Sequence, residues 1–155
     1  MSNEPVPPDN DNALEEGFFR ILIGDVSVAI KRHEDEPSSL HRRELVRVAY
    51  AAIEGVIWLY RTDIAEAARD LDLLKQDEEF ALGATNYFIS DDGQIARQVR
   101  LAPMLAVFRL TARIAERIDA DLFVRFDTGE WERLKQASAI RNRLTHPKQT
   151  SDLHL

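Results

Sequence analysis

The chain has 155 residues and no cysteine, and its 27 acidic residues outnumber its 20 lysines and arginines, which gives a formal net charge of −7. The lack of cysteine excludes disulfides, zinc–thiolate sites and cysteine nucleophiles, and it suits a reducing cytoplasm. The acidic balance argues against a broad basic face that coats nucleic acid, although it leaves room for a small basic pocket.

The N-terminal segment, residues 1–12, is acidic and carries three prolines without any apolar run. This composition predicts a disordered tail that is neither a signal peptide nor a membrane anchor. No later segment approaches the ~18–20 apolar residues that cross a bilayer, so no membrane partner is expected. We expect a single helical domain over residues 13–148 and a short C-terminal tail over residues 149–155.

Apolar residues recur at intervals of three and four through residues 13–33, which is typical of an amphipathic helix. A break at residues 34–37 follows, and Ser38 or Ser39 can cap a second helical segment. That segment keeps the same period and is expected to end at Leu82 or Gly83, since glycine suits a helix C-terminus. Its stretch 51–60 is apolar nearly all round except for Glu54, which predicts a central position or a subunit contact.

The second half of the chain begins with extended segments on either side of Asp91-Asp92-Gly93, a typical tight-turn sequence. Pro103 suits the first turn of another helix, which would end near residue 118. Asp127, with Glu130 three residues later, predicts the start of the last helix. The predicted fold is therefore all-α: an antiparallel bundle of four to five helices, with a short extended hairpin or loop near residues 86–97.

Other candidate groups have simple structural interpretations. Arg109, Arg113 and Arg117 are spaced four apart and predict a solvated helix face rather than an RNA contact. The scattered histidines predict no metal site. The large aromatic side chains mostly continue apolar stripes, so they are expected in the core rather than as platforms for bases; these are Tyr50, Trp58, Tyr60, Tyr87 and Trp131.

The most concentrated polar cluster closes the last helix. Residues 131–148 contain five basic side chains and one acidic side chain, Glu132, so the segment is locally +4. Arg141 continues the apolar face of this helix, and a guanidinium there requires a partner such as Glu54 or another acid of the long helix. His146 precedes Pro147, which disfavours helical backbone, so it should mark the helix end with its ring free to turn back.

The sequence Arg141-Asn142-Arg143-Leu144-Thr145-His146 resembles the Arg-Asn-x-x-x-His signature of HEPN (higher eukaryote and prokaryote nucleotide-binding) domains, and the helical layout around it is similar to theirs. The resemblance implies a metal-independent endoribonuclease without a cofactor. It further implies a toxin or defence component that works as a homodimer on RNA, with an antitoxin protein as a partner.

The resemblance also implies roles for individual residues. His146 would act as general base or acid at the RNA 2′-hydroxyl or the leaving 5′-oxygen, and Arg141 would stabilise charge on the phosphorane. Asn142 would hold one of these groups in place, while Arg143 and Lys148 would bind substrate. Because one histidine cannot be acid and base at once, a twofold axis would bring a second Arg141 and His146 across the site.

Two other hypotheses stay open at this point. The first is a non-catalytic HEPN-like module that binds a nucleotide or another protein. The second is a purely structural helical bundle in which Arg141 pairs with Glu54, so that its loss destabilises the fold.

Overall fold

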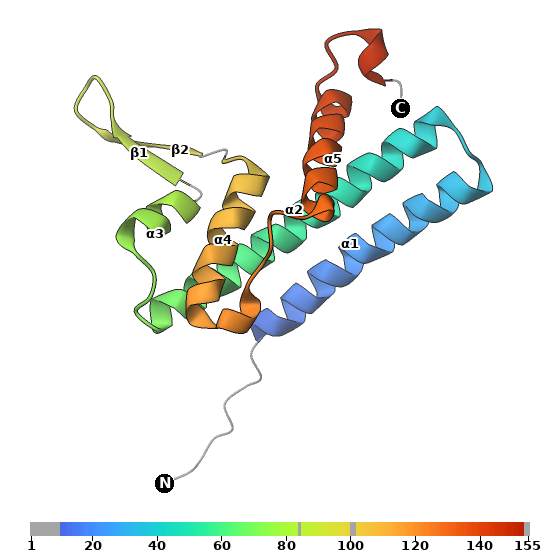
Figure 1. Cartoon of the computed structure of the whole chain (residues 1–155). Helices are drawn as coiled ribbons and strands as arrows, with labels where there is room; N and C mark the ends of the chain where they lie inside the picture. The colour runs from blue at the N-terminus through green and yellow to red at the C-terminus, as the bar shows by residue number, and fades with distance from the viewer. Residues whose placement is uncertain (1–9, 84, 100–101, 154–155) are drawn as a thin grey trace. The chain divides into compact units, whose positions relative to one another are not determined.

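The structure is a computed structural model that describes residues 10–83, 85–99 and 102–153. These residues contain five α-helices and one two-stranded hairpin, so the predicted all-α class with a short hairpin is confirmed. Figure 1 shows how these elements follow one another along the chain. Of the expected disordered tail, residues 1–9 lie outside the described residues, and the first helix already begins at Asn10. The chain divides into two compact units, residues 1–56 with 133–155 and residues 57–132.

The first unit contains α1 (Asn10–Asp35) and the first half of α2 (Ser39–Asp70), which form an antiparallel helical hairpin (Figure 1). The His41 N–H donates to Ser38 Oγ at 3.1 Å, so the predicted serine cap of α2 is confirmed. Gly55 of α2 faces the side chains of Leu22 and Phe18 of α1. A Cβ at this position would lie 2.5 Å from Leu22 Cδ1 and 3.2 Å from the Phe18 ring.

The long helical segment expected to reach Leu82 is two helices, because the chain turns between α2 and α3 (Gln76–Leu82). Asp72 adopts a φ of 56°, which aspartate tolerates better than most residues. The new helix is then favoured by acidic residues in its first turn, where Glu78 accepts the Lys75 backbone N–H at 3.1 Å. Apolar periodicity runs through both helices, which is why it did not predict the turn.

The second unit has its core between the end of α2, α3 and α4 (Met104–Ile118). One cluster of buried side chains in this core consists of Ile64, Ala68, Leu82, Ile114 and Ala115. A short 3-10 helix, η1 (Ala120–Leu122), follows α4. Pro103 precedes the first residue of α4, as its fixed φ predicts.

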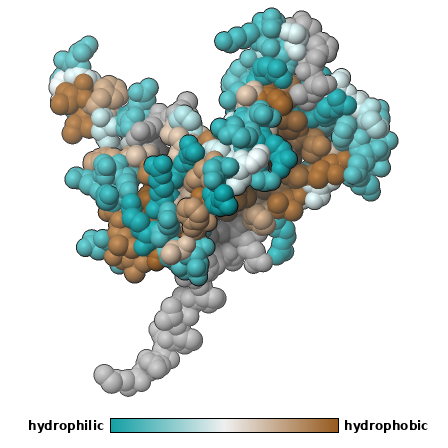
Figure 2. All heavy atoms as spheres, in the orientation of Figure 1, coloured by the Kyte–Doolittle hydropathy of each residue, from teal (hydrophilic) through white to brown (hydrophobic). Residues whose placement is uncertain are grey.

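The hairpin pairs β1 (Thr85–Ile89) with β2 (Ile95–Val99) in antiparallel register. Gly93 supplies the positive φ of 77° that its turn requires. Ile89 and Ile95 face each other at the turn end and are 78% and 79% exposed. Figure 2 shows this hydrophobic surface beside the hydrophilic turn.

Two of the aromatic residues expected in the core are instead exposed. Trp58 is 52% exposed on α2 and Tyr87 is 67% exposed on the hairpin, whereas Tyr50 and Trp131 are buried. Within the described residues the hairpin has two strands, and Tyr87 lines a pocket beside α3 instead of joining the core. Trp58 extends the apolar stripe of α2 beyond the side chains that are buried, such as Ile57 and Ile64.

Arg109, Arg113 and Arg117 of α4 are all exposed, as their spacing predicted, and two of them also make defined contacts. Arg117 donates to Glu78 and also to the Leu73 carbonyl, and its side chain is 33% exposed. The Arg109 guanidinium lies 5.0 Å from the Phe126 ring centre and 5.2 Å from that of Trp131, a cation–π arrangement. Both arginines therefore serve the packing of the second unit.

The last helix, α5 (Gly129–Thr145), begins later than Asp127 predicted. Its cap is Thr128, whose hydroxyl accepts the Trp131 N–H at 3.3 Å. Asp127 instead pairs with Arg125 through both carboxylate oxygens, at 3.1 and 3.0 Å. The predicted cap was wrong by one residue, because the Thr128 hydroxyl accepts the backbone N–H of the first turn while the Asp127 carboxylate is paired with Arg125.

Candidate functional site

Arg141 lies in the last turns of α5 and contacts α2 within the first unit. Its Nη2 is 2.7 Å from Glu54 Oε1 and 3.0 Å from Oε2, so the ion pair expected from the sequence is present. The two side chains are 26% and 40% exposed, so the pair lies at the edge of the unit rather than in its interior. A guanidinium in this position is fixed in place and still reachable from solvent.

Asn142 is the immediate neighbour of Arg141 and extends the same network. Its Oδ1 accepts a hydrogen bond from Arg141 Nη1 at 3.2 Å, so the amide helps to orient the guanidinium. Its backbone carbonyl accepts the His146 N–H at 3.0 Å. The structure thus connects Arg141, Asn142 and the backbone of His146, which are three of the five site residues predicted from sequence.

His146 directly follows the last residue of α5, as the proline after it predicted. Its side chain is exposed. The last turn is held by Arg47 of α2, whose Nη2 donates to the Leu144 carbonyl at 2.9 Å. This contact satisfies one of the carbonyls that a helix end leaves without an intrahelical partner.

The other two predicted residues, Arg143 and Lys148, are exposed on either side of His146. The Lys148 backbone N–H donates to Asp152 Oδ2 at 2.9 Å, and the Gln149 N–H donates to the same oxygen at 3.2 Å. These bonds to the Lys148 and Gln149 backbone, with the charge of Arg143, lower the pKa of Asp152. The segment expected as a tail therefore contains an ordered 3-10 helix, η2 (Thr150–Leu153).

Tyr50 of α2 contacts α5 close to Arg141. It is 4% exposed, and its hydroxyl donates to the Leu134 carbonyl at 2.9 Å. Burial raises the pKa of Tyr50, while a hydrogen bond with Ser138 and the charge of Arg141 partly offset the increase. The phenol therefore stays protonated at neutral pH and acts as a hydrogen-bond donor.

The sequence interpretation missed two α2 residues, Arg47 and Tyr50, which with Glu54 contact α5. Positions 47, 50 and 54 are spaced three and four apart, so they share one face of α2. That spacing was available in the sequence. The predicted polar cluster could have been extended from Glu54 to its neighbours on this face.

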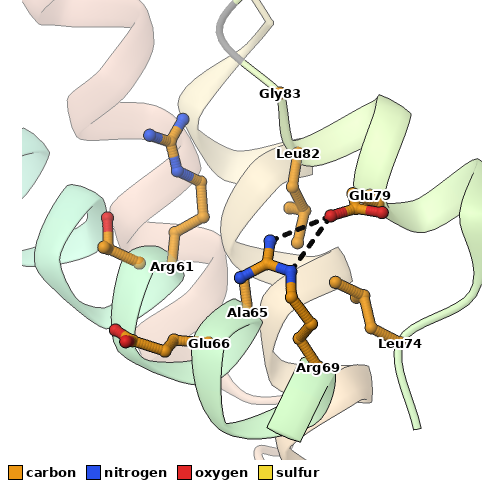
Figure 3. A pocket seen from close by; sticks show the side chains of 9 residues that line it. Arg61, Ala65, Glu66, Arg69, Leu74, Glu79, Leu82 and Gly83 are labelled. Atoms are coloured by element: carbon orange, nitrogen blue, oxygen red, sulfur yellow. Dashed lines mark hydrogen bonds and ion pairs between the residues drawn. The ribbon is translucent and has the colours of Figure 1, made fainter. Parts of the chain in front are cut away.

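The second unit contains a separate cleft of about 480 Å³ between α2 and α3 (Figure 3). Arg69 crosses it to Glu79, with Nε and Nη2 at 3.1 and 3.0 Å from Oε1. The other charged groups there are Arg61 and Glu66. The charges of two arginines and two glutamates cancel, so the side chains that line this cleft carry no net charge.

Among residues 10–83, 85–99 and 102–153, no group of three or more histidine, aspartate or glutamate side chains is arranged to hold a metal ion. Within the same residues, no helix is both long and apolar enough to span a membrane. No family model, curated protein or solved structure matches the chain.

Proposed function

We propose that this protein is a metal-independent endoribonuclease of the HEPN type, which acts as a homodimer as a toxin or defence component. The observation that carries the proposal is the Arg141 guanidinium, held by Glu54 and Asn142 yet 26% exposed, on the helix that ends next to His146. A fixed cation of this kind suits the charge that develops on a phosphorane.

In the proposed reaction the RNA 2′-oxygen attacks the adjacent phosphorus while its proton passes to an unprotonated His146. The bond from phosphorus to the 5′-oxygen then breaks as that oxygen takes a proton from the imidazolium of a second His146. The products are a 2′,3′-cyclic phosphate and a 5′-hydroxyl. Because acid and base come from two copies of the chain, the reaction requires a dimer.

The test is incubation of the purified protein with total RNA in EDTA. Cleavage to cyclic-phosphate ends is expected, with a loss of about 100-fold or more in Arg141→Ala and in His146→Ala. Circular dichroism checks that both variants are folded, and Arg61→Ala, which removes an arginine from the other unit, serves as the matched control. Cleavage that survives in both variants contradicts the proposal.

The ion pair itself favours a second candidate, a non-catalytic module of the same family that binds a nucleotide or a protein. The Glu54 carboxylate already neutralises Arg141, which reduces its attraction for phosphate. This alternative expects wild type and both variants to be folded and dimeric by light scattering, with no RNA cleavage in any of them.

A further inference from the structure

The first turns of α2 hold a second group of basic residues in the first unit. Residues 41–48 include His41, Arg42, Arg43 and Arg47 against one acid, Glu44. Glu44 is itself paired with Arg32 at 2.9 Å, which reduces its influence on the others. In a chain of net charge −7, this local excess of positive charge requires an explanation.

The contact from Arg47 to the Leu144 carbonyl, at 2.9 Å, joins this group to the end of α5. Leu144 lies between Arg143 and Thr145, so the Arg47 guanidinium is next to the turn that leads into His146 and Lys148. Arg47 is exposed, and a guanidinium has five N–H donors, of which this carbonyl takes one. The remaining donors are suited to phosphate oxygens.

We infer that the first turns of α2 and the end of α5 form one basic surface that binds the phosphate backbone of single-stranded RNA. The α2–α5 surface consists of His41, Arg47, Arg141, Arg143, His146 and Lys148. That the ligand is RNA rests on the proposed function. The path of the RNA strand over the protein is the new part of the inference. From the His146 end of α5, the strand continues over Arg47 onto α2.

A cleft of about 450 Å³ lies on this path and is lined by Leu40, His41, Glu44, Arg47 and Val48. Its volume is in the range of small-ligand sites and can take one nucleotide. His41 Nδ1 lies 2.8 Å from the Glu36 carbonyl, so this nitrogen carries the hydrogen and donates it. In the neutral ring Nε2 is then a hydrogen-bond acceptor, which suits a ribose hydroxyl.

The acidic remainder of the chain is consistent with such a surface. The α2–α5 surface contains three arginines, one lysine and two histidines, while carboxylates exceed basic groups over the chain as a whole. Repulsion by the acidic regions and attraction by the basic surface together confine a polyanion to one track. Binding should therefore be weak at high salt and restricted to this surface.

The test measures RNA affinity apart from cleavage. The full chain with His146→Ala is titrated into a fluorescein-labelled single-stranded RNA of mixed sequence in EDTA, and anisotropy is recorded at several salt concentrations. Arg47→Ala should raise Kd by about 3-fold to 10-fold and reduce the slope of log Kd against log salt by about 0.7, the value for one phosphate contact on a single strand. Arg61→Ala, on the same helix in the other unit, should change neither.

A second pair of variants avoids any loss of the Arg47 contact. Leu40 is 60% exposed and Leu71 is 56% exposed, so a carboxylate at either position is compatible with folding. Leu40→Glu places negative charge in the cleft and should weaken RNA binding by about 3-fold or more. Leu71→Glu, with the same change of net charge, should bind RNA like the parent.

Equal affinity in Arg47→Ala and Arg61→Ala, together with equal affinity in the two glutamate variants, overturns the inference. Tighter binding of a poly-glutamate peptide than of RNA also overturns it, because the surface then suits an acidic polypeptide. If wild type never cleaves RNA but these variants lose binding, the proposed reaction fails and the RNA surface stands. If wild type cleaves RNA with a KM that Arg47→Ala leaves unchanged, the reaction stands and this surface fails.

Discussion

Arg141 Nη2 bridges both carboxylate oxygens of Glu54, at 2.7 and 3.0 Å, and so connects α5 to the middle of α2 within one unit. The pair is partly exposed, at 26% and 40% for the two side chains. Solvent therefore weakens the attraction between the two charges. It also reduces the desolvation cost of forming the pair. The pair is therefore not a fully buried structural ion pair.

Removal of either partner should have a modest effect on stability. We expect Arg141→Ala and Glu54→Gln each to lower the free energy of unfolding by about 1 kcal/mol, the range for an exposed pair with good geometry. Urea denaturation of the two single variants and the double variant gives the coupling energy. A loss of about 3–5 kcal/mol in Arg141→Ala would indicate a buried pair and favour the purely structural hypothesis.

The ion pair between Glu78 and Arg117 should make stability depend on pH. The hydrogen bond from Arg117 lowers the pKa of Glu78 below its ordinary 4.5. A carboxyl with a depressed folded-state pKa adds stability that is complete above 4.5 and is lost as pH falls through the lower, folded value. Glu78 is 12% exposed, so Glu78→Gln should cost about 1–2 kcal/mol at pH 7 and flatten the acid side of the stability curve.

The matched control for this change is Glu79→Gln. Glu79 pairs with Arg69, and both side chains are more than half exposed, at 55% and 56%. Its substitution should cost less than about 0.5 kcal/mol and leave the acid slope unchanged. Equal effects of the two substitutions on chemical denaturation between pH 3 and 7 would show that burial of the Glu78 pair adds nothing.

The sequence predicted the parts of the fold that depend on local chemistry. Ser38 caps α2, Pro103 starts α4 and the helix ends before His146, because each of these features follows from one side chain and its own backbone. The helix break near Asp72 was missed, since apolar spacing continues across it and the signal is a single positive φ.

The candidate site could be predicted only in part, because some of its contacts do not follow from local sequence. Arg141 and Glu54 could be paired because one charged group sits on each of two apolar stripes. The spacing of Arg47 and Glu54 placed both residues on one face of α2, but it did not predict the contact of Arg47 with the Leu144 carbonyl. The role of Arg47 depends on where α5 ends relative to α2, which only the three-dimensional structure gives.

The cap of α5 provides a test of the corrected helix start. Because the Thr128 hydroxyl accepts the Trp131 N–H, Thr128→Ala should lower the free energy of unfolding by about 1 kcal/mol. Asp127→Ala removes only an exposed pair with Arg125 and should show a smaller loss in thermal denaturation. The opposite ranking of the two variants would restore Asp127 as the cap.

Gly24 of α1 and Gly55 of α2 should respond differently to alanine. No heavy atom lies within 4 Å of a Cβ built on Gly24, so Gly24→Ala should stabilise the protein by about 0.5–1 kcal/mol through helix propensity. A Cβ on Gly55 lies 2.5 Å from Leu22 Cδ1, so Gly55→Ala must displace that side chain and strain the packing of α1 on α2. We expect Gly55→Ala to be about 1–2 kcal/mol less stable than Gly24→Ala in urea denaturation. Equal stabilisation by both would mean that the Leu22 side chain moves aside at no cost.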